Sequence, residues 1–248
     1  MPSITENPRT LARLTGLFFL LTILGGIVAQ AFISQRLIDF SDAAATANNI
    51  LSNKGLFTLG FTIYLIEMAC QVTTATLLYQ LLKPVNRTVA LLAVLLELTG
   101  IGIKTVARVF YIAPLFVLGA SPSGPEAASS VLSGFTTEQL QSIALVLLKV
   151  NDSGAAVALA FFGFSTPLFG YLIFRSKFLP RWLGLLVMVA GLGWLTFLYP
   201  PLGYRVFMII APLGLLSALV KIFWLLIRGV DERKWKEQAE AAGVIRKK

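Results

Sequence analysis

Long, nearly uninterrupted apolar runs are the feature of this sequence that most constrains its fold. A helix needs about 20 residues to cross a hydrocarbon layer of about 30 Å, and six runs reach or approach that length. They cover residues 11–33, 56–82, 89–118, 144–174, 182–199 and 207–227. Hydrophobic residues make up 56% of the chain and charged residues 13%, whereas a soluble domain is about 45–50% apolar. The sequence therefore predicts an all-α integral membrane protein, a single domain of six transmembrane helices over residues 1–248.

Basic residues are concentrated in the segments that would share one side of the membrane. Fourteen of the 21 Lys and Arg residues lie before the first run, after the second, after the fourth and after the sixth. They are Arg9, Arg13, Lys83, Arg87, Arg175, Lys177, Arg181, Arg228, Arg233, Lys234, Lys236, Arg246, Lys247 and Lys248. The other loops hold Arg36, Lys54 and Arg205, and the loop 121–130 holds no basic residue. The positive-inside rule then places both termini in the cytoplasm, in agreement with six crossings.

The two ends of the chain each allow two interpretations. Arg9, Arg13, the apolar run and the small residues at 28–31 resemble a secretory signal with its cleavage site. An uncleaved first helix explains the same residues, because the apolar run continues to Ile33 beyond that site. The basic cytoplasmic tail, 231–248, is expected either to form a helix on the anionic membrane surface or to be solvated.

The residue inventory excludes several kinds of site. The chain has no histidine and one cysteine, which excludes a histidine-ligated haem, a structural zinc site and a Cys–His nucleophile pair. Cys70 lies in the second run and is expected to be a small buried apolar residue rather than a reactive thiol. We expect no metal and no cofactor. The net charge of +9 follows from the loops and does not indicate a nucleic-acid partner.

Two segments carry helix-capping signals. Ser41 and Asp42 can cap a short helix through Asn49 on the outer side. Thr136 with Gln139 forms a capping box that would start the fourth long helix before the membrane. From residue 137 to 174 that helix would be about 57 Å long, nearly twice the hydrocarbon thickness. We therefore expect its start either to project from the membrane or to bend. The polar residues and the glycine at 149–154 mark the break or the entry level, and Pro167 offers a second kink further in.

Seven ionisable side chains lie inside or at the ends of the apolar runs, where charge is costly. Each costs about 2.5–3.5 kcal/mol at the middle of a membrane helix. They are Glu67, Glu97, Lys104, Arg108, Lys149, Asp152 and Lys221. With three acids against four bases, their charges nearly balance, as a compensated buried network requires.

The spacing of these residues places them on shared helix faces. Glu97, Lys104 and Arg108 are seven and four residues apart, so their side chains share one face of the third run. A second polar stripe with similar spacing lies on the second run: Glu67, Gln71 and Thr74. Because the other faces can meet lipid, we expect the two stripes to face each other.

Depth in the membrane predicts which charges pair. Glu67 and Lys104 lie near the midpoints of two neighbouring antiparallel runs and should be at a similar depth. Arg108 approaches the outer side where the fourth run enters with Asp152, which makes them the second expected pair. Lys221 lies within reach of either glutamate.

The charged network supports more than one function. A hydrated cavity lined by these side chains would bind or transport a small polar or anionic molecule, or relay protons through Glu67 and Glu97. Alternatively, the charges only hold helices together in a structural or regulatory membrane subunit with a protein partner. A third hypothesis, an intramembrane enzyme with Glu97 and Asp152 as acid and base, lacks a nucleophile or metal set beside them, so we expect no catalytic residues.

Three stretches carry a recognisable pattern in their order and spacing. They are Tyr79-Gln-Leu-Leu-Lys-Pro-Val-Asn-Arg87, Phe161-Phe-Gly-Phe followed by Gly170-Tyr-Leu-Ile-Phe-Arg-Ser-Lys-Phe-Leu-Pro-Arg-Trp-Leu-Gly184, and Trp224-Leu-Leu-Ile-Arg-Gly-Val230. In these stretches the chain resembles a bacterial family of multi-pass membrane proteins catalogued as domain of unknown function 4386. The resemblance implies a six-helix protein of the bacterial inner (cytoplasmic) membrane. It implies no activity and no functional residues.

Overall fold

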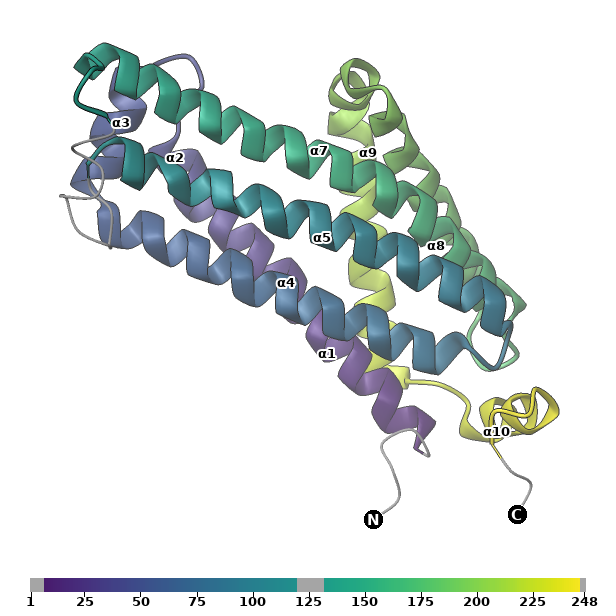
Figure 1. The fold of residues 1–248 in the computed structure, drawn as a ribbon. Coiled ribbons are helices and arrows are strands. Elements are labelled where there is room, and N and C mark those ends of the chain that lie inside the picture. The colour runs from purple at the N-terminus through teal and green to yellow at the C-terminus, as the bar shows by residue number, and fades with distance from the viewer. Residues whose placement is uncertain (1–6, 120–131, 246–248) are drawn as a thin grey trace. The chain divides into compact units, whose positions relative to one another are not determined.

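The computed structural model describes residues 7–119 and 132–245. The predicted outer loop 121–130 and the last part of the predicted tail, 246–248, lie outside these ranges. The described residues form helices joined by turns, with no strand among them, which confirms the all-α fold. Six helices in this part of the chain are long and apolar enough to cross a membrane, and Figure 1 shows their order along the chain.

The helices follow the predicted apolar runs closely. The first span consists of α1 (Pro8–Ile27), a π-helical turn (Val28–Ser34) and α2 (Gln35–Leu37). The next three spans are α4 (Lys54–Leu82), α5 (Arg87–Val117) and α7 (Thr137–Arg175). The last two are α8 (Arg181–Trp194) with a 3-10 turn (Leu195–Leu198), and α9 (Pro200–Phe223) with a π-helical turn (Trp224–Arg228). Two short helices, α3 (Ala43–Ser52) and α10 (Glu232–Ala241), complete the described chain.

Both predicted caps are present. Asp42 Oδ1 accepts the backbone N–H of Ala45 at 2.8 Å at the start of α3. At the start of α7, the backbone N–H of Thr136 donates to Gln139 Oε1 at 2.8 Å, and the Gln139 N–H donates to Thr136 Oγ1 at 3.3 Å.

The fourth span has no break at 149–154, because α7 runs without interruption from Thr137 to Arg175, whereas the alternative, a start that projects from the membrane, stays a prediction. The polar residues at 149–154 are accommodated within the helix. Ser153 Oγ donates back to the carbonyl of Lys149 at 2.9 Å, so its hydroxyl is satisfied without opening the backbone. No proline interrupts the N–H ladder at this point, since Pro167 lies further along the helix.

The chain forms two compact units, and each is described by itself. Unit 1 contains the described parts of Met1–Leu21, Ala69–Gly102 and Ala156–Lys248, and unit 2 contains those of Thr22–Met68 and Ile103–Ala155. The boundary falls within α1, α4, α5 and α7, so each unit holds a stretch of the same four helices.

Unit 2 has an aromatic core. The ring of Tyr111 stacks on Phe57 with ring centres 4.5 Å apart, and Tyr64 meets Tyr111 edge to face at 5.3 Å. Aliphatic side chains from the π-helical turn, α2, α3, α5 and α7 surround these rings: Ala29, Ile33, Leu37, Ile50, Leu115 and Leu148. The core thus ties α3, which is too short and polar to span, onto the long helices (Figure 1).

In unit 1, glycines let the backbones of α7 and α8 approach closely. A Cβ atom on Gly184 would lie 2.4 Å from the Phe174 backbone nitrogen, and one on Gly170 would lie 2.6 Å from that of Met188. Small residues at such interfaces are typical of helix packing in membranes, where close contact replaces the hydrophobic effect as the driving force.

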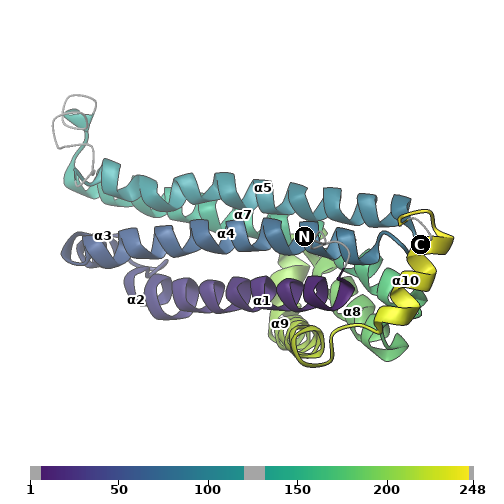
Figure 2. The same ribbon diagram turned by 90° about the horizontal axis from the view of Figure 1, so that it is seen from below.

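The C-terminal tail forms a helix that is docked onto unit 1. Trp235 of α10 is 1% exposed, and its indole Nε1 donates to the carbonyl of Leu81 at the end of α4 at 2.9 Å. Figure 2 shows α10 beside this end of α4. Asp231 caps α10 by accepting the Lys234 backbone N–H at 3.1 Å, and this bond holds the pKa of the Asp231 carboxyl below its usual range. Within the described residues, the tail is therefore helical and anchored by a buried tryptophan.

Candidate functional site: two buried polar clusters

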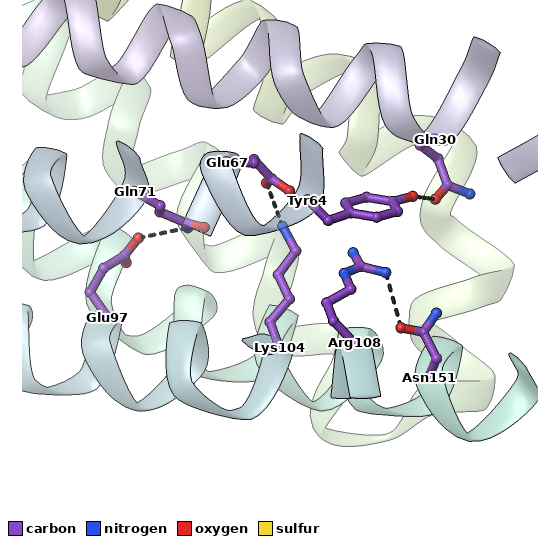
Figure 3. Close-up of polar contacts among 8 residues, drawn as sticks. All are labelled: Gln30, Tyr64, Glu67, Gln71, Glu97, Lys104, Arg108 and Asn151. Atoms are coloured by element: carbon purple, nitrogen blue, oxygen red, sulfur yellow. Dashed lines mark hydrogen bonds and ion pairs between the residues drawn. The ribbon is translucent and has the colours of Figure 1, made fainter. Parts of the chain in front are cut away.

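Polar side chains gather in two clusters, one in each unit, and all of them are buried or half-buried except Gln30, which is exposed. The first, called here the Arg108 cluster, lies in unit 2 and consists of Gln30, Ser34, Tyr64, Glu67, Lys104, Arg108, Tyr111 and Asn151. The second, the Glu97 cluster, lies in unit 1 and consists of Phe19, Gln71, Glu97, Ser165 and Lys221. Figure 3 shows most of the Arg108 cluster together with the Gln71–Glu97 contact.

The expected ion pair between Glu67 and Lys104 is present. Lys104 Nζ lies 2.6 Å from Glu67 Oε1, and the two side chains are 18% and 4% exposed. Part of the burial of Glu67 comes from α1, because a Cβ atom on Gly26 would lie 3.5 Å from Glu67 Oε1. The other carboxylate oxygen, Oε2, is buried and has no hydrogen-bond partner among the described residues. One half of the carboxylate is therefore satisfied and the other half is not.

Arg108 is held by a ring and an amide. Its guanidinium carbon lies 3.5 Å from the centre of the Tyr64 ring, a cation–π contact. Its Nη1 donates to Asn151 Oδ1 at 3.0 Å (Figure 3). Arg108 is 5% exposed, and its Nε finds no hydrogen-bond partner in the described part of the chain.

The sequence favours Asp152 as the partner of Arg108. In the structure the hydrogen bond from Arg108 goes to Asn151, the residue before Asp152. The Asp152 side chain is exposed and interacts electrostatically with Tyr64. Helices α5 and α7 are close here, since a Cβ atom on Gly154 would lie 2.5 Å from Ala107 Cβ.

Two tyrosine hydroxyls extend the Arg108 cluster to α1. The Tyr64 hydroxyl donates to Gln30 Oε1 at 2.6 Å. Ser34 Oγ lies 3.1 Å from the Tyr64 hydroxyl and donates to the Tyr111 hydroxyl at 3.2 Å. Both Gln30 and Ser34 belong to the π-helical turn after α1, and single π turns inside α-helices are frequent at functional sites.

In the Glu97 cluster, both oxygens of one carboxylate are engaged. Gln71 Nε2 donates to Glu97 Oε1 at 3.3 Å, and the hydroxyl of Ser165 on α7 donates to Oε2. Lys221 of α9 interacts electrostatically with Glu97, and its Nζ lies 4.4 Å from the centre of the Phe19 ring. Of the two glutamates in reach of Lys221 by sequence, Glu97 is the one in the same unit. Gln71 Oε1 is buried without a hydrogen-bond partner among the described residues.

Three polar residues of the predicted network lie elsewhere. The side chains of Lys149 and Asp152 are exposed on α7. Thr74 is buried, but its hydroxyl donates to the carbonyl of Cys70 on its own helix at 2.8 Å. Cys70, the one cysteine of the sequence, is buried. Among residues 7–119 and 132–245, no group of three or more Cys, Asp or Glu side chains is placed to hold a metal ion.

Several members of the clusters are not among the residues singled out from the sequence. Tyr64 lies three residues before Glu67, and Tyr111 three after Arg108, so the polar faces of α4 and α5 continue into these rings. That spacing is a signal the sequence contains. Asn151 is adjacent to the expected Asp152. Gln30 and Ser34 have no comparable signal, because their direction depends on the π-helical turn.

The arrangement leaves buried hydrogen-bonding capacity that is unused. Glu67 Oε2, Gln71 Oε1 and Arg108 Nε are the three such atoms in the described residues. A buried polar atom without a partner costs about 1–3 kcal/mol, and more if it is charged, so native proteins contain few of them. In the Arg108 cluster, the N–H of Arg108 Nε can donate to an anion and Glu67 Oε2 can accept from an N–H or O–H group.

The fold and these clusters define the chain as an all-helical multi-pass membrane protein that buries charged side chains among its helices. The family described as domain of unknown function (DUF4386) matches residues 14–229. The chain therefore belongs to this family, as its three sequence stretches indicate. No curated protein and no solved structure matches the chain.

Proposed function

We propose that this membrane protein binds, and in a transport cycle carries, a small polar or anionic molecule at the Arg108 cluster. The observation that supports this most strongly is the pair of buried, charged and unpartnered atoms in one cluster, Arg108 Nε and Glu67 Oε2. A ligand with an acidic group and a hydrogen-bond donor would satisfy both. Intramembrane ionisable residues commonly mark substrate and ion pathways.

The balance of charge favours an anionic group on this ligand. Glu67, Lys104 and Arg108 place two cations against one carboxylate. Lys104 is paired with Glu67, whereas the contacts of Arg108 are to a neutral amide and a ring. The rigid fork of a guanidinium suits carboxylate and phosphate oxygens. We therefore place the acidic group of the ligand at Arg108 and its donor group at Glu67.

A thermal-stability screen of the full chain in mild detergent tests this proposal. Small carboxylates, phosphates and amino acids are added singly, and a ligand at 100 times its dissociation constant stabilises the folded state by about 2.7 kcal/mol. We expect at least one compound to raise the unfolding temperature of the wild type, and Arg108→Gln to abolish that rise. Lys149→Gln, which removes an exposed cation from α7, is the matched control and should keep it. An equal rise in Arg108→Gln, or none in the wild type, contradicts the proposal.

A structural or regulatory membrane subunit is the second candidate function. It is favoured by the polar links that join α4 to α5, namely Glu67–Lys104 at 2.6 Å and Gln71–Glu97 at 3.3 Å. Polar contacts between membrane helices contribute about 0.6–2 kcal/mol each, so these links can serve packing alone. Purification in mild detergent distinguishes the two, because a subunit would retain a stoichiometric protein partner and a self-contained binding protein would not.

We further propose that both termini lie in the cytoplasm and that the protein resides in the cytoplasmic membrane. The exposed bases Arg9, Arg87 and Arg181 support this orientation through the positive-inside rule. In a Cys70→Ala background, Asn86→Cys and Asn48→Cys introduce thiols at exposed positions before α5 and in α3. An impermeant thiol reagent should label Asn48→Cys in intact cells and Asn86→Cys only after permeabilisation. The reverse pattern would invert the topology.

A further inference from the structure

An open groove of about 640 Å³ lies in unit 1, where the end of α9, the start of α10 and the turn between α7 and α8 meet. Five basic residues line it: Arg9, Lys177, Arg228, Arg233 and Lys234. Two carboxylates, those of Asp231 and Glu232, also line it. The groove therefore carries a surplus of positive charge.

The backbone around the groove is fixed by specific contacts. The Asp231 N–H donates to the carbonyl of Phe178 at 3.2 Å, and the Lys177 N–H donates to Gln238 Oε1 at 3.2 Å. The chain turns between α9 and α10 at Gly229, whose φ of +65° favours glycine. A Cβ atom there would also lie 3.2 Å from Arg9 Cγ. The groove is thus a built feature of the docked tail.

Both carboxylates in the groove already have cationic partners. Arg9 Nε lies 3.2 Å from Glu232 Oε1, and Lys234 Nζ lies 3.4 Å from Asp231 Oδ2. The N-terminal amide of α10 at Lys234 is likewise occupied by the Asp231 cap. Lys177 and Arg228 form no ion pair with another described residue. These two side chains are therefore the ones available to an external anion.

The surroundings of the groove favour a lipid over a soluble anion. Arg228 ends the π-helical turn that closes the last membrane span. Trp224, one turn earlier, lines the groove and meets Trp182 edge to face with ring centres 5.5 Å apart. Tryptophans concentrate at the level of lipid headgroups. Phe178 and Leu179 add apolar walls, which a phosphate ion would not need but a lipid would contact.

We propose that this groove binds the headgroup of an anionic phospholipid, with the phosphate between Lys177 and Arg228 and the glycerol and upper acyl chains against Trp224. The bound lipid fastens α10 to the membrane surface. This site is independent of the Arg108 cluster and of the function proposed for it.

Native mass spectrometry of the full chain, released from mild detergent with equal phosphatidylglycerol and phosphatidylcholine, tests the proposal. Each Lys or Arg near an anionic lipid surface contributes about 1 kcal/mol to binding, so its removal should weaken the affinity for the lipid about fivefold. The double variant Lys177→Gln/Arg228→Gln should therefore lose about 25-fold in affinity for phosphatidylglycerol and keep its affinity for phosphatidylcholine, which also shows that it is folded. The matched control Arg175→Gln/Arg181→Gln removes two exposed bases that flank the same turn and do not line the groove. It should retain the preference for phosphatidylglycerol.

Three results would overturn the proposal. The first is a wild type that shows no preference for phosphatidylglycerol. The second is a control double variant that loses as much affinity as Lys177→Gln/Arg228→Gln, which would indicate general surface attraction. The third is glycerol phosphate, without acyl chains, binding as tightly as the lipid, which would assign the groove to a soluble phosphate compound.

Discussion

The guanidinium of Arg108 rests on the face of Tyr64, with its central carbon 3.5 Å from the ring centre. The hydroxyl at the far end of the same ring donates to Gln30 Oε1 at 2.6 Å. Tyr64 therefore connects the buried charge on α5 to the π-helical turn of the first span. A desolvated cation–π contact is worth about 2 kcal/mol or more, so this ring is a principal support of a charge that would otherwise be expensive to bury.

Two substitutions of Tyr64 separate the contribution of the ring from that of the hydroxyl. Tyr64→Phe keeps the face under Arg108 and loses the bond to Gln30, whereas Tyr64→Leu loses both. We expect Tyr64→Phe to reduce the unfolding free energy by about 1 kcal/mol and Tyr64→Leu to reduce it by about 2 kcal/mol more. Reversible unfolding in mixed micelles measures both. Equal losses would show that the ring face contributes nothing.

The Glu67–Lys104 pair predicts an unusual pattern of single and double variants. Lys104→Gln leaves a carboxylate that is 4% exposed without its cation, while Glu67→Gln leaves an ammonium that is 18% exposed. Breaking a buried pair costs about 3–5 kcal/mol because of the charge that is left. We therefore expect Lys104→Gln to be the most destabilising, Glu67→Gln less so, and the double variant to be more stable than Lys104→Gln. Additive losses in unfolding free energy would contradict this.

The fold could be predicted from the sequence because the patterns that determine it are local. Length and apolarity define the six spans, and the caps at Asp42 and Thr136 depend on residues three positions apart. The pairing of Glu67 with Lys104 follows from helix periodicity and depth. These features need no knowledge of how helices rotate against one another.

The contacts that the sequence did not predict depend on how the helices are rotated against one another and on the local course of the backbone. The π-helical turn at 28–34 redirects Gln30 and Ser34 toward two tyrosines, and no residue type marks it in advance. A shift of one residue on α7 gives the Arg108 bond to Asn151 rather than Asp152, since adjacent residues point about 100° apart on a helix.

A substitution at Gly154 tests the close contact between α5 and α7 beside Arg108. A Cβ atom at Gly154 would lie 2.5 Å from Ala107 Cβ, whereas one at Gly102 would meet nothing within 4 Å. We expect Gly154→Ala to lower the unfolding free energy by about 1–3 kcal/mol through overpacking. Gly102→Ala, the matched control on α5, should be neutral or slightly stabilising because alanine favours helix. Equal effects of the two variants would show that the contact does not restrict packing.

Docking of the tail depends on one side chain, Trp235. Trp235→Phe keeps an aromatic ring and loses the bond to the Leu81 carbonyl, while Trp235→Ala also leaves a cavity worth about 3–5 kcal/mol. Limited trypsin digestion at Lys234 and Lys236, both exposed, reports release of α10. We expect slow cleavage in the wild type, somewhat faster cleavage in Trp235→Phe and fast cleavage in Trp235→Ala. The exposed Tyr199, which does not line the groove, provides the control, because Tyr199→Ala should leave the rate unchanged. Wild-type rates in Trp235→Ala would refute the docking.

The most direct test of the proposed function is an experimental structure in a lipid environment, at a resolution that reveals ordered water and small ligands. We expect density within about 3 Å of both Arg108 Nε and Glu67 Oε2, from a ligand or from the water that a ligand would displace. In Arg108→Gln this density should be absent while the helices keep their positions. Apolar side chains closed over both atoms, with no density beside them, would contradict the binding site and leave the charges as links between helices.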